Sequence, residues 1–118
     1  MQVLRSAGLF AANVLWRATR SKSAGRVLVN ALAADDPNVR TIAGMLLVRG
    51  GKDAVPLIQE AIRRQLNLPQ TLVMAGDIGA VSLEPDLQKF VDHPDPTVSQ
   101  SARDALRILE LQKKADVK

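Results

Sequence analysis

Proline and glycine divide the apolar part of this sequence into short segments. In DDPNVRTIAGMLLVRGGKDAVPLI, residues 35–58, Asp36 precedes Pro37, and Gly50-Gly51 separates two apolar runs. An Asp side chain accepts hydrogen bonds from the free amides at a helix start, and Pro fits the first helical position. Gly allows the left-handed backbone that ends many helices. The stretch therefore predicts two helices joined by a tight corner.

The same punctuation recurs along the chain. Pro69 and Pro85 each open an apolar segment, and Asp95-Pro96 opens the last one. By the same logic, Asp53 is expected to cap the helix that contains Pro56 in its first turn. Apolar residues within the segments recur every three or four positions, and no segment alternates with the period of a strand. We predict an all-α fold of about seven helices.

Length and charge suggest how the chain is divided. At 118 residues the chain has the size of one domain. Its net charge is +4, and five basic residues precede the first acidic residue, Asp35, so the excess of positive charge lies in the N-terminal segment. We therefore expect a basic helix pair over residues 1–34. Apolar runs are shorter than the ~20 residues of a membrane span, so we expect a soluble, cytoplasmic protein. The remaining segments are predicted as repeats at 35–66 and 67–93, a closing helix at 94–113 and a tail at 114–118.

A repeating pattern of small residues supports stacked helices. VRTIA, TLVMA and VSQSA end at Ala43, Ala75 and Ala102, at intervals typical of helical repeats. Together with GGKDAVPLI, these segments resemble short bacterial HEAT repeats over residues 24–111. The resemblance implies a right-handed α-α superhelix, with the first helix of each repeat on the convex side and the second on the concave side.

Candidate chemistry in the sequence is sparse. Gly51-Lys52 is followed by Asp53 instead of Ser or Thr, so the corner does not match a phosphate-binding P-loop. His93 has only Asp92 and Asp95 close by in the sequence, and Asp95 is expected to cap a helix; a metal site would need further ligands. Because Cys and Tyr are absent and His occurs once, we expect no catalytic residues, no metal and no cofactor.

The first helix offers a candidate protein-binding face. At 100° per residue, one arc of its wheel is apolar and is expected to be buried; this arc holds Val3, Leu4, Ala7, Phe10, Ala11, Val14, Leu15 and Ala18. Arg5, Leu9, Trp16 and Arg20 lie in another arc and are expected to form an exposed contact surface, because Trp and Arg often anchor interfaces. The alternative is that tilting of the helix buries Trp16.

Three functions follow from these observations. The first is a non-catalytic protein-interaction scaffold that binds a protein partner or another copy of itself. The second is backbone-directed binding of nucleic acid through exposed cations; the candidates are Arg17, Lys22, Arg26, Arg63, Arg64 and Lys89. The third comes from the resemblance alone, since some short HEAT-like proteins resemble phycobilisome lyases, which implies a tetrapyrrole-binding module.

Overall fold

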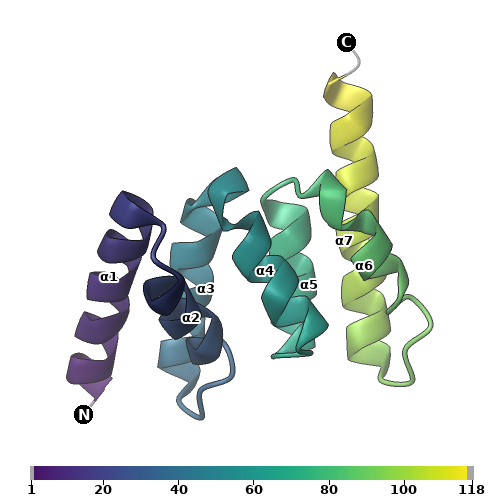
Figure 1. The fold of residues 1–118 in the computed structure, drawn as a ribbon. Helices are drawn as coiled ribbons and strands as arrows, with labels where there is room; N and C mark the ends of the chain where they lie inside the picture. Colours follow the sequence, from purple (N-terminus) through teal and green to yellow (C-terminus); the bar gives the residue numbers. More distant parts are fainter. Residues whose placement is uncertain (1, 117–118) are drawn as a thin grey trace.

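The chain is all-helical over the part that the computed structural model describes, namely the backbone of residues 2–116 and the side chains of residues 8–115. This confirms the all-α prediction. Within these residues there are seven α-helices and two short 3-10 segments (Figure 1). The elements are α1 (Gln2–Thr19), α2 (Lys22–Ala31), α3 (Pro37–Arg49), η1 (Gly51–Ala54), α4 (Val55–Arg63), α5 (Leu68–Asp77), η2 (Val81–Leu83), α6 (Glu84–Gln88) and α7 (Pro96–Asp116).

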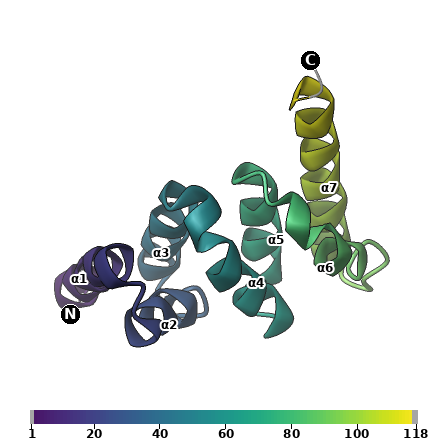
Figure 2. The ribbon, with the colours of Figure 1, turned by 45° about the horizontal axis from the view of Figure 1, so that its top comes forward.

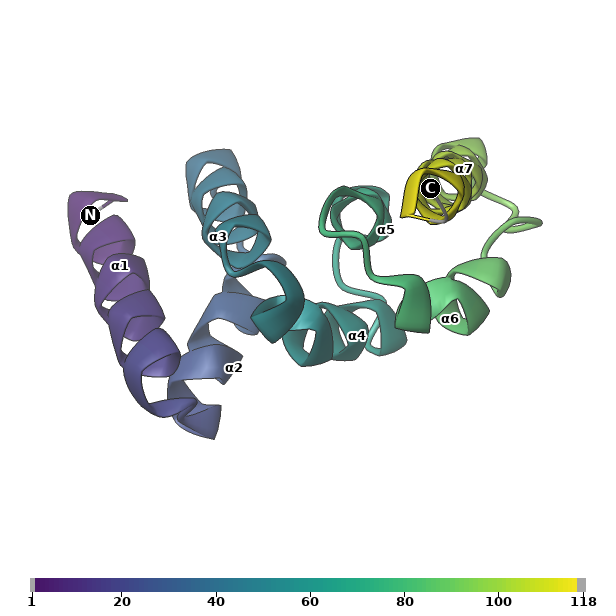
Figure 3. The same cartoon turned by 90° about the horizontal axis from the view of Figure 1, so that it is seen from above.

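The helices form two rows. Seen from above, α1, α3, α5 and α7 stand in one row, and α2, α4 and α6 form the other (Figure 3). Within the first row α3 packs against α1 and α5, and α5 packs against α7; in the second row α4 packs against α2 and α6. Figure 2 shows α1 and α7 at the two ends of the molecule.

One continuous apolar core fills the space between the rows. Its largest fully buried side chains come from both rows and from their connections: Leu28, Leu32, Leu47, Ile58, Ile62, Leu72, Leu83, Leu87 and Leu109. Full burial of one such side chain is worth about 1.5–3 kcal/mol relative to leaving it exposed. The helices are short, so this shared core rather than intrinsic helix propensity holds most of them in place.

The small residues of the repeated pattern lie in the core, and a glycine beside one of them lies where two helices meet. Ala43, Ala75 and Ala102 are fully buried. Gly76 of α5 faces α7 so closely that an added Cβ atom would stand 3.0 Å from the Cα atom of Ala105. The absence of a side chain at Gly76 therefore sets how closely α5 and α7 approach.

Two predicted helix caps are present and one is not. The carboxylates of Asp36 and Asp95 accept hydrogen bonds from the amides of Asn38 (2.8 Å) and Thr97 (2.9 Å). The prediction that Asp53 caps a helix is wrong, because Asp53 lies inside η1 and α4 follows directly after Ala54. Gly51, with φ of +58°, makes the corner, and the 3-10 turn then leads straight into α4.

The C-terminal boundary was predicted too early. Residues 114–116 belong to α7, which continues to Asp116, so the prediction of a tail from 114 is wrong for these residues. No Gly or Pro follows Pro96 to end the helix. In addition, Lys113 forms a salt bridge with Glu84 and thereby ties the last turns of α7 to the start of α6.

We predict opposite effects for the same substitution at two helical glycines. Gly76→Ala should lower the free energy of unfolding by roughly 1 kcal/mol, because an overpacking cost of about 1–3 kcal/mol outweighs a helix-propensity gain of about 1 kcal/mol. Gly8→Ala in α1, with no atom within 4 Å of the added Cβ, should raise it by about 0.5–1 kcal/mol. Urea unfolding measures both. A stabilised Gly76→Ala protein would contradict the close contact between α5 and α7.

Candidate interaction surfaces

Trp16 and Leu9 are buried, so the prediction that they form an exposed contact surface is wrong. Each is only 4% exposed. The indole of Trp16 lies between α2 and the end of α3: Cβ atoms built on Gly25 and Gly50 would each stand 3.2 Å from it. Two glycines thus open a slot for the largest side chain of the chain, and Trp16 fastens α1 to both neighbouring helices.

Arg20, another predicted contact residue, is already engaged within the chain. Its backbone adopts a left-handed conformation (φ +57°) that ends α1, and its guanidinium donates a hydrogen bond of 2.7 Å to the carbonyl oxygen of Arg17. The guanidinium also lies 4.9 Å from the centre of the Trp16 ring and 2.8 Å from a carboxylate oxygen of Asp53. The side chain of Arg5, the fourth predicted residue, lies outside the described residues.

The opposite face of α1 is apolar and exposed, where burial was predicted. Phe10, Val14 and Leu15 are 45%, 67% and 51% exposed, and the small residues Ala11 and Ala18 are exposed beside them. The prediction of a buried stripe is wrong for these five residues, because α2 and α3 both pack on the Trp16 side. The side chains of the other three predicted stripe residues, Val3, Leu4 and Ala7, lie outside the described residues.

A second apolar surface lies between α3 and α5. It is a shallow groove of about 460 Å³, whose lining is mostly apolar and includes Val48, Pro69 and Met74. Met45 and Val73 also line it and are 43% and 36% exposed. Sequence reasoning missed this groove, because its lining is divided between α3 and α5 and the groove exists only where the two helices meet.

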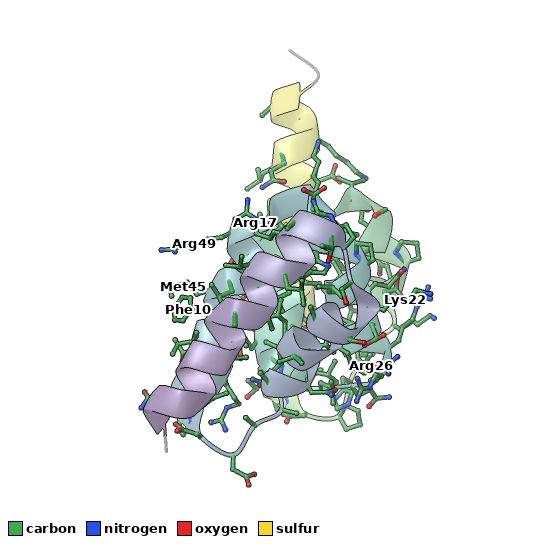
Figure 4. The ribbon with its side chains drawn as sticks, turned by 60° about the vertical axis from the view of Figure 1, so that its left-hand side comes forward. Phe10, Arg17, Lys22, Arg26, Met45 and Arg49 are labelled. Atoms are coloured by element: carbon green, nitrogen blue, oxygen red, sulfur yellow. The ribbon has the colours of Figure 1, made fainter. Side chains whose placement is uncertain are left out.

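Charged residues mark one end of that groove. Arg49 follows Met45 by four residues on α3, and Asp77 follows Val73 by four on α5. Because residues four apart lie on the same face of a helix, both charges fall one turn beyond the exposed apolar side chains. Phe10 and Arg17 of α1 lie on the same side of the molecule as Met45 and Arg49 (Figure 4). The groove thus has an apolar middle and a charged end.

The structure separates the cations that were predicted to bind nucleic acid. Lys22 and Arg26 of α2 lie on the opposite side of the molecule from Arg17 (Figure 4). Arg64 donates to Asn30 (3.0 Å) and pairs with Glu60 (3.4 Å), which links α2 to α4. The predicted cations therefore do not form one continuous patch.

Arg63 and Lys89, the remaining two predicted cations, surround a buried carboxylate. Asp86 is 6% exposed and accepts hydrogen bonds of 3.2 Å from both Arg63 and Gln59. Burial by itself raises the pKa of Asp86, but the hydrogen bonds from Gln59 and Arg63 and the positive charges of Arg63 and Lys89 together lower it below its usual value. This group fastens α4 to α6.

The sequence cluster around His93 does not converge on a common point. The Nδ1 atom of His93 accepts a hydrogen bond of 3.0 Å from the amide of Asp95, whose carboxylate caps α7. Asp92 instead pairs with Arg103 at 3.5 Å. Within the described part of the chain, no group of three His, Cys, Asp or Glu side chains is placed to hold a metal ion.

The helices of residues 2–116 do not include one that is long and apolar enough to cross a membrane. Comparison of the chain with protein-family models, with curated proteins and with solved structures finds no match.

We expect Trp16→Ala to lower the free energy of unfolding by about 3–5 kcal/mol, because it empties the slot between Gly25 and Gly50. Val14→Ala on the outward face of the same helix should change it by less than about 0.5 kcal/mol. Urea unfolding followed by circular dichroism compares the two variants. Equal effects would show that α1 does not depend on the indole.

The pair between Arg63 and Asp86 predicts a dependence of stability on pH. A carboxyl whose pKa is lowered by folding stabilises the protein fully above its ordinary pKa of 3.8, and this contribution is lost as the pH falls through the lower folded-state value. Asp86→Asn should cost about 1.5–3 kcal/mol at pH ~7. The substitution should also remove part of the stability that the wild-type protein loses in acid. That loss is measured as the difference between the urea midpoints at neutral and acidic pH. An unchanged difference would contradict the role given to this carboxyl.

Proposed function

We propose that this chain is a non-catalytic protein-interaction scaffold, built as a short HEAT-like α-α solenoid that acts in the cytoplasm. The two rows of helices, the buried alanines at matching places and the caps at Asp36 and Asp95 support this assignment. In such a scaffold the rigid core presents a surface, and recognition needs no chemical step.

The observation that carries the proposal is the apolar groove between α3 and α5. Met45 and Val73 are exposed there on neighbouring helices, and Gly44 lets the side chain of Gln70 pack closely against α3. An apolar side chain of a partner can be desolvated between two rigid helices at little entropic cost, because neither helix has to rearrange. Isolated exposed apolar residues are common, but paired ones that line a groove are typical of contact sites.

The charged end of the groove gives the contact a direction. Arg49 and Asp77 carry opposite charges, and neither forms a salt bridge among the described residues. A partner with one basic and one acidic group beside its apolar side chain would satisfy both charges. Such complementary charges orient a partner and exclude others more than they add affinity.

Nucleic-acid binding is less well supported by the same surfaces. Arg63 and Arg64 are paired with Asp86 and Glu60, and Arg17 lies away from Lys22 (Figure 4). A phosphate backbone is recognised by a continuous run of unpaired cations. The groove between α3 and α5 therefore carries the proposal.

Replacing the apolar lining of the groove should abolish partner binding. We expect the double variant Met45→Glu, Val73→Glu to fold normally, since both side chains are partly exposed. In affinity capture from the native extract, it should no longer retain the partner proteins that the wild-type chain retains. Buried apolar anchors of this kind are worth about 2 kcal/mol or more each. Quantitative mass spectrometry measures the loss.

The matched control is Leu111→Glu, because Leu111 is 59% exposed on α7, which contributes no residue to the groove. This variant should retain the same proteins as the wild type. Capture that survives in the groove variant but fails in the control would place the binding site at α7 and refute the assignment of the groove.

A further inference from the structure

The outward face of α1 is apolar, and no other described part of the chain covers it. Phe10, Val14 and Leu15 are the three largest side chains on it, and the exposed residues Ala11 and Ala18 complete a face without polar interruption. The interior helices α3 and α5 have neighbours on both sides, whereas α1 has one only on its Trp16 side (Figure 3). The strongest apolar stripe of the helix therefore faces outward.

Cations lie on both sides of this apolar face. When the molecule is viewed towards α1, Arg17 and Arg49 lie on one side, and Lys22 and Arg26 lie on the other (Figure 4). None of the four forms a salt bridge within the described part of the chain. Residues 1–34 contain no acidic residue, and the carboxylate of Asp53 is neutralised by Arg20 at 2.8 Å.

We propose that this end of the molecule docks on an anionic lipid surface, with the apolar face of α1 inserted between the headgroups. An amphipathic helix that lies in the interface buries its apolar residues at the boundary of the acyl chains, while flanking cations attract anionic lipids. Each Lys or Arg held near such a surface strengthens binding by about five-fold. The apolar lining of the groove between α3 and α5 takes no part and only Arg49 at its charged end is shared, so this inference does not depend on the proposed scaffold function.

The distribution of charge favours a membrane over a single partner helix. The four cations come from three helices, and they lie on opposite sides of α1 (Figure 4). A helix docked along α1 would pair with charges beside its own apolar seam, whereas Lys22, Arg26 and Arg49 belong to the other helices α2 and α3. A flat anionic surface neutralises both sides together.

A second copy of the chain fits this face poorly. The 18 residues of α1 span about 27 Å, and a strip about 10 Å wide offers roughly 270 Å². A stable dimer usually buries about 800 Å² on each partner. Two copies joined through α1 would also bring acid-free, basic segments together, which costs free energy.

Co-sedimentation with vesicles tests the proposal. The full chain should bind phosphatidylcholine vesicles that contain about 30% phosphatidylglycerol and should bind pure phosphatidylcholine vesicles at least ~10-fold more weakly. Raising the salt to about 0.5 M should weaken binding, because it screens the flanking charges. The double variant Val14→Glu, Leu15→Glu should lose binding at least ~10-fold and keep its helical circular dichroism.

Matched controls separate the apolar and the charge contributions. Leu111→Glu on α7 should bind like the wild type. Lys22→Gln with Arg26→Gln should weaken binding by about 25-fold, whereas Arg103→Gln with Arg107→Gln, the same loss of charge on α7, should change it by less than about two-fold.

Two kinds of result would overturn the proposal. One is equal binding by the wild type and by the Val14→Glu, Leu15→Glu variant, or no binding to anionic vesicles at low salt. The other is light scattering that shows a dimer of the wild type, but a monomer of that variant, with no wild-type binding to vesicles. That second result would assign the face to another copy of the chain.

Discussion

The position of α1 depends on the burial of one side chain, Trp16. The indole fits between α2 and α3 only because Gly25 and Gly50 carry no side chains there; a Cβ atom at either position would lie 3.2 Å from the ring. Arg20 covers the ring and binds Asp53, which connects the end of α1 to the corner after α3. Once the Trp16 side of α1 is occupied in this way, its more apolar side must face outward.

Close approach of helices recurs along the first row. Gly76 lets α5 approach the backbone of α7. The buried residues Ala43 and Ala75 have small side chains, so α3 and α5 can pack closely against the core. Packing that relies on small residues fixes the distances between helices closely, because a close-packed interior tolerates little change in volume. It also leaves the larger apolar residues Met45 and Val73 on the outer face, where they line the groove.

Charged residues play two separate roles in this structure. Arg20 and Arg63 join neighbouring elements through salt bridges with Asp53 and Asp86. Arg64 pairs with Glu60 one turn earlier and reaches α2 through a hydrogen bond to Asn30. Arg17, Lys22, Arg26 and Arg49 form no salt bridge among the described residues and lie around α1 (Figure 4). Basic residues are thus structural where they pair with a carboxylate, and the unpaired ones around α1 are available for binding. The sequence shows the excess of basic residues before Asp35, but not which of them find a partner.

Local signals were sufficient for the helices and for most of their ends. The caps at Asp36 and Asp95, the corner at Gly51 and the all-α class follow from interactions within a few residues, so they could be predicted from the sequence. The orientation of α1 could not be predicted. Its wheel has two faces with apolar residues, and the choice between them depends on Gly25 and Gly50, which belong to other helices. The groove between α3 and α5 likewise exists only after two helices have packed, because burial is a property of the assembled core.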